Sequence, residues 1–219
     1  MRRRTCCAGA LALTAGPALL SARAWSAGTD TAAAPPASPA SPASPASDTR
    51  QAALALLRRA SGGLVVMMRH ALAPGTFDPA GFVAGDCGTQ RILSDEGRAQ
   101  ARAIGAWYRE QRLVPTAVRS SAWCRCLDTA QLAFGRAPPW PPLDSMLRET
   151  ARRDSQVAWL RGELARRAHA EVAGFEVWVT HQVNVTALAG GFADSGDAVL
   201  LRHDAARDGP VVLARLQIA

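Results

Sequence analysis

Two short apolar segments constrain the fold most. Each is followed directly by polar residues, and if each segment is a buried strand, these residues lie at the edge of the sheet. Residues 64–68 follow a Gly-Gly pair and precede Arg69 and His70, and residues 176–180 precede His181. Apolar runs of this length are typical of strands that are buried on both faces. Ligands of open α/β sheets bind at the carboxyl ends of such strands. The sequence therefore predicts that these polar residues lie at a ligand-binding edge.

A third segment is predicted to bring a second arginine to the same edge. Residues 117–121 read as a strand and lead into the sequence Trp-Cys-Arg-Cys. Arg125, the arginine of that sequence, falls near the start of a helix that we expect to run through Leu132. The rim should therefore hold two Arg and two His side chains, namely Arg69, His70, Arg125 and His181.

Helical segments alternate with the predicted strands. The clearest helix begins at Ser94, a good capping residue, and two acidic residues in its first turn favour the positive end of the helix dipole. The side chains that we expect on its inner face are Ala99, Ala103, Ile104 and Trp107. Further helices are predicted over residues 49–60 and 154–170, and closing strands over residues 199–202 and 211–218. This alternation indicates a single α/β domain with a doubly wound, mostly parallel sheet flanked by helices on both faces.

The first 24 residues are predicted to be a signal peptide. Three arginines follow Met1, residues 8–20 form an apolar run too short for a stable membrane span, and small residues stand at a suitable cleavage position. Cleavage would give a periplasmic or secreted protein with no membrane span, whereas a retained segment would anchor the chain to the membrane. Residues 25–48 are rich in Ala, Pro and Ser and predict a semi-rigid linker. The folded domain is therefore expected over residues 49–219.

The positive net charge does not indicate a nucleic-acid partner. The chain of 219 residues carries a net charge of +7, and removal of residues 1–24, which hold four Arg and no acidic residue, leaves +3. All basic residues are Arg, and they are scattered along the chain instead of forming one patch. We therefore expect no nucleic-acid binding.

Four motifs along the chain resemble those of the histidine phosphatase superfamily, which includes phosphoglycerate mutases and histidine acid phosphatases. They are Arg-His-Ala at 69–71, LSDEGRAQA at 93–101, SSAWCRCLDTA at 120–130 and Val-Thr-His at 179–181. The resemblance implies that His70 is a nucleophile that carries a transient phosphate, that Arg69, Arg125 and His181 bind the phosphate, and that no metal or other cofactor is needed. Ala71 stands where mutases of the family often carry Gly, which favours a phosphatase.

The chemistry of these residue types agrees with that implication. A phosphate monoester repels an anionic nucleophile, so a neutral imidazole is the better attacking group, and its second ring nitrogen is expected to donate to a backbone carbonyl. The forked N–H donors of two arginines suit the equatorial phosphate oxygens. Their charge is also expected to lower the pKa of His70 and keep the ring neutral.

The general acid for the leaving group is marked less clearly. Glu149 resembles the acid of the family and is our first choice, with Asp86 and Asp144 as rivals. The alternative for Glu149 is an exposed carboxylate paired with neighbouring arginines. Thr89, Gln90 and Arg91, which follow the nucleophile, could contact the distal part of a substrate or belong to a simple loop.

Three cysteines, Cys87, Cys124 and Cys126, remain once the signal peptide is set aside. Cys87 lies in the loop after the first strand, and the other two flank Arg125, so a disulfide from Cys87 to either one is reasonable in an oxidising compartment and would fix Arg125. The Cys-x-Cys pair is spaced more closely than the usual ligand pairs of structural zinc sites, and we predict no metal.

The leading hypothesis is an exported phosphomonoesterase that acts on a small phosphorylated substrate. The resemblance to exported members of the family implies an envelope glycolipid phosphate or a small sugar phosphate as the substrate. Two alternatives stay open: a phosphate-binding module with weak turnover, and a phosphotransferase of the phosphoglycerate mutase type. The sequence does not define the oligomeric state.

Overall fold

The structure is a computed structural model that describes residues 45–135, 138–147, 150–170 and 173–218. The predicted signal peptide and most of the predicted linker lie outside the described residues. Helix α1 (Pro45–Arg58) begins within the last residues assigned to the linker, ahead of the expected domain start at Thr49. None of the helices in the described ranges is long and apolar enough to cross a lipid bilayer.

A five-stranded sheet with the order β2-β3-β1-β4-β5 forms the centre of the fold. Its strands are β1 (Leu64–Arg69), β2 (Ala117–Ser120), β3 (Phe175–Thr180), β4 (Ala198–Asp204) and β5 (Gly209–Leu216). Strand β3 pairs in parallel with both β1 and β2, whereas β4 runs antiparallel to β1 and to β5. The predicted α/β class is confirmed, and the sheet is mixed, with a parallel core and an antiparallel hairpin at one edge.

Strand β1 is apolar from Leu64 to Met68 because both faces of the sheet are covered. Val66 and Met68 pack into the hydrophobic cluster on one face, and Val65 and Met67 into the cluster on the other. All four side chains are fully buried. A strand in this position has no solvent-facing side, so its sequence does not alternate between polar and apolar residues.

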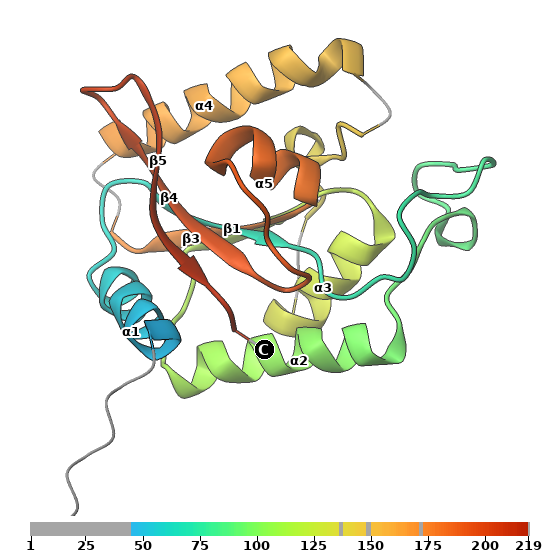
Figure 1. The fold of residues 1–219 in the computed structure, drawn as a ribbon, viewed down its shortest axis with the longest axis horizontal. Coiled ribbons are helices and arrows are strands. Elements are labelled where there is room, and N and C mark those ends of the chain that lie inside the picture. Colours follow the sequence, from blue (N-terminus) through green and yellow to red (C-terminus); the bar gives the residue numbers. More distant parts are fainter. Residues whose placement is uncertain (1–44, 136–137, 148–149, 171–172, 219) are drawn as a thin grey trace, which may run out of the picture. The chain divides into compact units, whose positions relative to one another are not determined.

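Helices cover both faces, as the doubly wound arrangement predicts (Figure 1). Helices α1, α2 (Asp95–Glu110) and α3 (Cys124–Phe134) contribute to the first cluster, and α4 (Arg153–His169) and α5 (Gln182–Ala189) to the second. Three short 3₁₀ turns, η1 (Cys87–Thr89), η2 (Pro141–Leu143) and η3 (Thr150–Arg152), lie in the connections.

The inner face of α2 differs in part from the prediction. Ser94 caps the helix by accepting the Gly97 N–H, and Ile104 and Trp107 are buried as expected. Ala99 and Ala103 are exposed, however, and the remaining buried positions are Gly97, Ala101, Gly105 and Tyr108. The reason is close backbone packing: a Cβ on Gly97 would overlap the Leu72 carbonyl, and one on Gly105 would overlap Ala133 of α3. Glycine therefore sets the rotation of the helix.

Candidate active site

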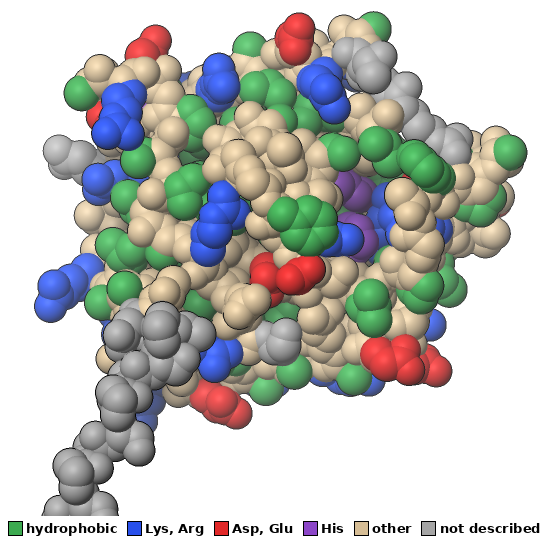
Figure 2. Space-filling view, in the orientation of Figure 1, with side chains coloured by type: hydrophobic (Ala, Val, Ile, Leu, Met, Phe, Trp, Pro, Cys, Tyr) green, Lys and Arg blue, Asp and Glu red, His purple; other side chains and the backbone are tan. Residues whose placement is uncertain are grey.

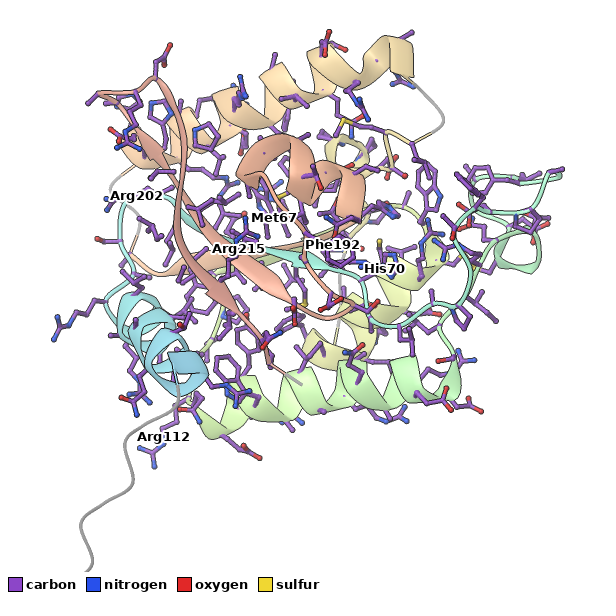
Figure 3. All side chains as sticks on the ribbon, in the orientation of Figure 1. Met67, His70, Arg112, Phe192, Arg202 and Arg215 are labelled. Carbon is purple, nitrogen blue, oxygen red and sulfur yellow. A yellow bond between two sulfur atoms is a disulfide. The ribbon has the colours of Figure 1, made fainter. Side chains whose placement is uncertain are left out.

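His70 follows the carboxyl end of β1 (Figure 3), and His181 follows the carboxyl end of the neighbouring parallel strand β3. The His70 N–H donates to the Thr180 carbonyl at 2.9 Å, which continues the parallel pairing past the strand ends. The ring centroids of His70 and His181 lie 5.6 Å apart, and both side chains are buried. In the space-filling view, histidine side chains lie in a hollow beside a basic side chain, with hydrophobic side chains around it (Figure 2).

His70 is held as a neutral imidazole with one nitrogen turned toward Arg125. Its Nδ1 lies 2.7 Å from the Ala71 carbonyl, and because a carbonyl only accepts, this nitrogen carries the proton. Its Nε2 accepts from Nε of Arg125 at 3.3 Å. Burial, more than the charges of Arg125 and Arg69, lowers the pKa of His70 to about 3. The expected effect of the arginines is present, but desolvation is the larger cause.

Arg125 lies in the first turn of α3 and is buried between both histidines. Its Nη2 donates to Nδ1 of His181 at 3.4 Å while its Nε faces His70. The Thr129 hydroxyl donates to the Arg125 carbonyl and accepts the Ala71 N–H, so α3 is tied to the residue after His70. The N–H at the start of α3 is already used, because that of Cys124 donates to the Gln90 side chain.

Two further arginines border the site. The Arg69 Nη1 donates to the Ala193 carbonyl at 2.9 Å, and its guanidinium lies 5.3 Å from the centroid of the Phe192 ring. Arg91 donates through Nη1 to backbone carbonyls of the loop after β1. The Nε atoms of Arg69 and Arg91 are buried and have no hydrogen-bond partner within the described ranges. The Nε of Arg91 still lies 3.9 Å from Oδ1 of Asp78 in an ion pair, so the Nε of Arg69 is the donor that a bound anion could satisfy.

His181 is oriented by a hydrogen-bond relay on the side away from Arg125. Its Nε2 lies 2.9 Å from the Ser121 hydroxyl, which donates to Asp144 at 3.1 Å. Because Nδ1 accepts from Arg125, Nε2 carries the proton and donates to Ser121. Burial first, and then the charge of Arg125, lowers the pKa of His181 well below its usual value.

The three acid candidates have different positions. Asp144 lies behind His181 in this relay and therefore serves the orientation of that ring. Asp86 is exposed and caps the η1 turn by accepting the Gly88 N–H. Glu149 lies outside the described residues.

Asp78 is a site residue that the sequence analysis missed. It contacts the Nη1 and Nη2 atoms of Arg125 at 2.8 and 3.3 Å. Nothing in its spacing from His70 separates it from the other loop carboxylate, Asp86, so no local signal marks it.

The disulfide joins Cys87 to Cys124, the first of the two pairings that the sequence left open, with a Cα–Cα distance of 5.7 Å. Cys126 is a free, buried thiol with Sγ 3.5 Å from His181 Nε2, and burial raises its pKa to about 12. Since Cys124 is oxidised, it is not available as a zinc ligand. The described part of the chain holds no group of three or more His, Cys, Asp or Glu side chains placed to bind a metal.

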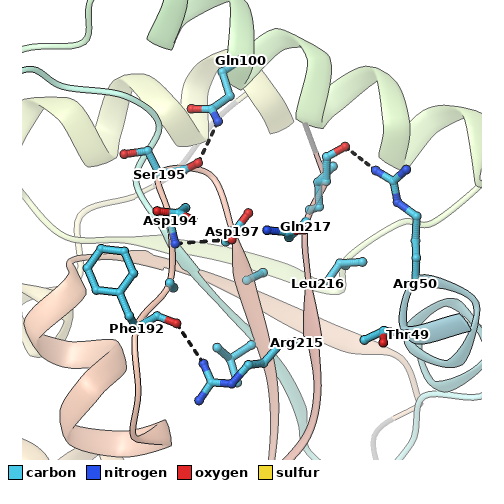
Figure 4. A pocket seen from close by; sticks show the side chains of 14 residues that line it. Thr49, Arg50, Gln100, Phe192, Asp194, Ser195, Asp197, Arg215, Leu216 and Gln217 are labelled. Carbon is cyan, nitrogen blue, oxygen red and sulfur yellow. Dashed lines mark hydrogen bonds between the residues drawn. The ribbon is translucent and has the colours of Figure 1, made fainter. Parts of the chain in front are cut away.

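A separate cavity of 890 Å³ lies between the segment after α5, strand β5 and the start of α1 (Figure 4). Its lining does not include His70, Arg125 or His181. Its polar groups are paired within the lining, since Gln100 donates to the Ser195 carbonyl, the Asp194 N–H to Asp197 and Arg215 to the Phe192 carbonyl (Figure 4). We assign the chemistry to the cluster of His70, Arg125 and His181 instead.

Residues 65–156 match the sequence model of the histidine phosphatase superfamily, branch 1. No curated protein matches the chain in sequence. The fold is similar to that of alpha-ribazole phosphatase from Shigella flexneri, with 14% identity, a TM-score of 0.50, and coverage of 71% of this chain and 97% of that one.

Two other solved structures are also similar. Phosphoglycerate mutase from Thermus thermophilus has 21% identity, a TM-score of 0.45, and coverage of 71% of this chain and 99% of that one. The protein histidine phosphatase SixA, complexed with tungstate, has 16% identity, a TM-score of 0.47, and coverage of 70% and 96%. At 14% identity, the likeness to alpha-ribazole phosphatase indicates the fold alone.

We predict that stability falls on mild acidification. A histidine in the unfolded chain titrates near pH 6.5, whereas His70 in the folded chain has a pKa of about 3. Between these values the unfolded state binds more protons, so the free energy of unfolding decreases as the pH is lowered. At pH 5 the contribution of His70 alone is about 2 kcal/mol. Urea unfolding at pH 7.5 and at pH 5.0 measures this decrease in the free energy of unfolding.

His70→Asn should show a smaller difference between the two pH values than the wild-type protein. The control His169→Asn changes an exposed histidine at the end of α4 and should keep the full difference. Equal pH dependence in His70→Asn and in the control would contradict a buried neutral His70.

We also predict that the oxidised protein contains the Cys87–Cys124 cross-link and a free Cys126. Peptide mass spectrometry without reduction should detect that cross-link, and Cys126→Ala should retain it. Cys87→Ser combined with Cys124→Ser should lower the free energy of unfolding by up to about 4 kcal/mol, because the closed loop restricts the unfolded chain. Three alkylated thiols in the oxidised protein would refute the pairing.

Proposed function

Because the chain belongs to the histidine phosphatase superfamily, we propose that it is a phosphomonoesterase that works through a phosphohistidine on His70. Members of this superfamily are phosphatases and phosphotransferases. The observation that carries the proposal is the neutral His70, whose unprotonated Nε2 faces Nε of Arg125 within a buried basic site. A nucleophile without charge beside cationic donors is what a phosphate dianion requires.

The proposed reaction has two steps. Nε2 of His70 forms a bond to phosphorus while the bond from phosphorus to the ester oxygen breaks, and the departing oxygen takes a proton from a general acid. Water then attacks the phosphohistidine, phosphate leaves, and Nε2 is restored. The Ala71 carbonyl accepts from Nδ1 of His70 and so stabilises the positive charge on the phosphorylated ring.

The arginines and His181 would stabilise the transferring group. Nε of Arg69, buried and without a partner within the described ranges, and the inner edge of Arg125 provide donors for the equatorial oxygens. A bound dianion favours the protonated form of a neighbouring imidazole, so His181 would become a donor through Nδ1. Ser121 and Asp144 hold the opposite nitrogen of that ring.

Glu149 is proposed as the general acid, on the resemblance of its sequence context to that of the family. Asp144 and Asp86 are weaker candidates, because one supports His181 through Ser121 and the other caps an exposed turn. The same carboxylate would act as the base that activates water in the second step.

An exported enzyme that acts on a phosphate with an apolar portion is the proposed biological setting. The export rests on the sequence of residues 1–24. The substrate class is supported by exposed apolar side chains near the site: Phe192 stacks on Arg69, and Phe77 precedes Asp78, with exposed fractions of 63% and 67%. Exposed apolar surface near a polar site favours an amphipathic ligand, such as an envelope glycolipid phosphate, over a free sugar phosphate. Phosphate release from both classes, compared at equal concentration, tests this choice.

A phosphate-binding module and a mutase are the remaining alternatives. A module would bind inorganic phosphate without hydrolysing a chromogenic phosphate ester. A mutase would transfer the phosphate of His70 to a second hydroxyl instead of to water, which product analysis distinguishes.

We predict that His70→Ala removes essentially all turnover, with a loss of about 10⁴-fold or more. Arg69→Ala, Arg125→Ala and His181→Ala should each cost about 10²- to 10³-fold, because they stabilise charge in the transition state. Labelled phosphate should be trapped on His70 when the reaction is quenched without acid. His169→Ala is the control, and label on a serine or cysteine would overturn the mechanism.

We predict that Glu149→Gln discriminates between leaving groups. The loss should be about 10²-fold on an alkyl phosphate and small on nitrophenyl phosphate, whose phenolate leaves without a proton. Kinetics on both esters measure this ratio, with the exposed Glu110→Gln as control. Equal losses on the two esters would assign Glu149 to binding instead.

A further inference from the structure

Asp78 stands in the loop between β1 and α2 and accepts hydrogen bonds from three surrounding residues. Its Oδ1 accepts the Arg91 N–H at 3.1 Å and the Arg125 Nη1 at 2.8 Å. Its Oδ2 accepts the Trp123 Nε1 at 3.2 Å and the Arg125 Nη2 at 3.3 Å. Only 10% of the Asp78 side chain is exposed. The carboxylate is therefore fixed from several directions, unlike a typical loop acid.

The two carboxylate oxygens occupy one particular side of the Arg125 guanidinium. They take its outer end, formed by Nη1 and Nη2, in a forked arrangement. The other edge, formed by Nε and Nη2, faces Nε2 of His70 and Nδ1 of His181. Asp78 thus leaves the reactive edge of Arg125 turned toward the place where a phosphate would meet both imidazoles.

We infer that Asp78 is a positioning residue that orients Arg125 for phosphate binding and transfer. This inference rests on the proposed function, since it assigns Asp78 to the same site. An arginine side chain has several rotatable bonds. The paired hydrogen bonds from Nη1 and Nη2 to Asp78 restrict them and so also fix the edge of the guanidinium that faces the histidines. Preorganised donors stabilise the transition state more than donors that must first be ordered.

The loop that carries Asp78 is fastened to the helix that carries Arg125. The disulfide joins Cys87 of this loop to Cys124, the residue directly before Arg125. Gln90 accepts the Cys124 N–H, and the Phe82 ring stacks on Trp123 at a centroid distance of 5.1 Å. These contacts hold the loop against the N-terminal turn of α3, so the Asp78 carboxylate stays within hydrogen-bond distance of the Arg125 guanidinium.

Asp78 is ionised and so does not serve as the general acid. Burial alone would raise its pKa, but the Arg91 N–H and then Arg125 lower it below the usual value. A carboxylate in this state accepts hydrogen bonds and has no proton to give to a leaving group.

The test is a double-mutant cycle between Asp78→Asn and Arg125→Lys, in which lysine keeps the charge but cannot form the fork. Asp78→Asn keeps the size of the side chain and removes the charge. We expect kcat/KM to fall about 10- to 100-fold in Asp78→Asn, equally on nitrophenyl and alkyl phosphates. In the Arg125→Lys background, Asp78→Asn should change kcat/KM less than about twofold, since the two residues act as one unit. Calorimetric binding of inorganic phosphate should follow the same pattern.

The exposed Asp95→Asn is the matched control and should leave all parameters unchanged. Circular dichroism and thermal unfolding at the assay temperature confirm that each variant is folded. Wild-type values in Asp78→Asn, or a loss that multiplies with that of Arg125→Lys, would overturn the inference while the proposed function stands. A loss confined to the alkyl ester would make Asp78 the acid. A wild-type protein that neither hydrolyses esters nor binds phosphate would refute the proposed function together with the inference.

Discussion

The buried guanidinium of Arg125 is the interaction on which the rest of the site depends. It contacts the Asp78 carboxylate and both imidazoles, and its side chain is 3% exposed. A cation in such a position requires a counter-charge and a full set of acceptors, because it has lost its water. Asp78 supplies the charge, and His70 and His181 accept as neutral rings. The same contacts also favour the neutral form of His70, although burial of the ring is the larger cause of its low pKa.

The scaffold gives this cluster its geometry through the order of the strands. Since β1 and β3 are parallel neighbours, their carboxyl ends, and with them His70 and His181, fall side by side. Helix α3 follows the parallel strand β2 and directs Arg125 to the same edge. The loop after β1 is then fixed on α3 by the disulfide and by Asp78. The strands β1 and β3 and the helix α3 therefore position the proposed catalytic side chains, while the apolar residues of the same elements pack in the hydrophobic core.

The site also contains features that a structure optimised for stability alone would avoid. His70 and His181 are buried without charge, which makes the protein sensitive to acid, and the buried Nε atoms of Arg69 and Arg91 make no hydrogen bond within the described ranges. Unpaired donors of this kind cost stability. Their concentration around one nucleophile is the arrangement expected where binding of an anion compensates them.

The sequence alone determined the local features of the site, because each depends on short-range chemistry. Residues 64–68 and 177–179 are apolar since both faces of the sheet are covered, and the polar residues that follow them mark the ligand-binding edge. Ser94 caps α2 through a contact three residues away. Local sequence predicted that Arg69, His70, Arg125 and His181 lie at this edge, and the family resemblance implied their roles. The acid remained open, and Glu149 lies outside the described residues.

Only the tertiary structure decided features that depend on distant parts of the chain. Asp78 and Asp86 are both acidic residues of the loop after β1. Only the packing of α3 against this loop determines that Asp78 is the one that contacts Arg125. Cys124 pairs with Cys87, whereas Cys126, two residues further along the helix, points inward to the Thr180 carbonyl and His181. The inner face of α2 is set where Gly97 meets the backbone of Leu72 and Gly105 that of Ala133. The periodicity of the sequence does not predict these features. Each depends on which backbone or charged group lies opposite, and this is fixed only when strands and helices from separate segments pack together.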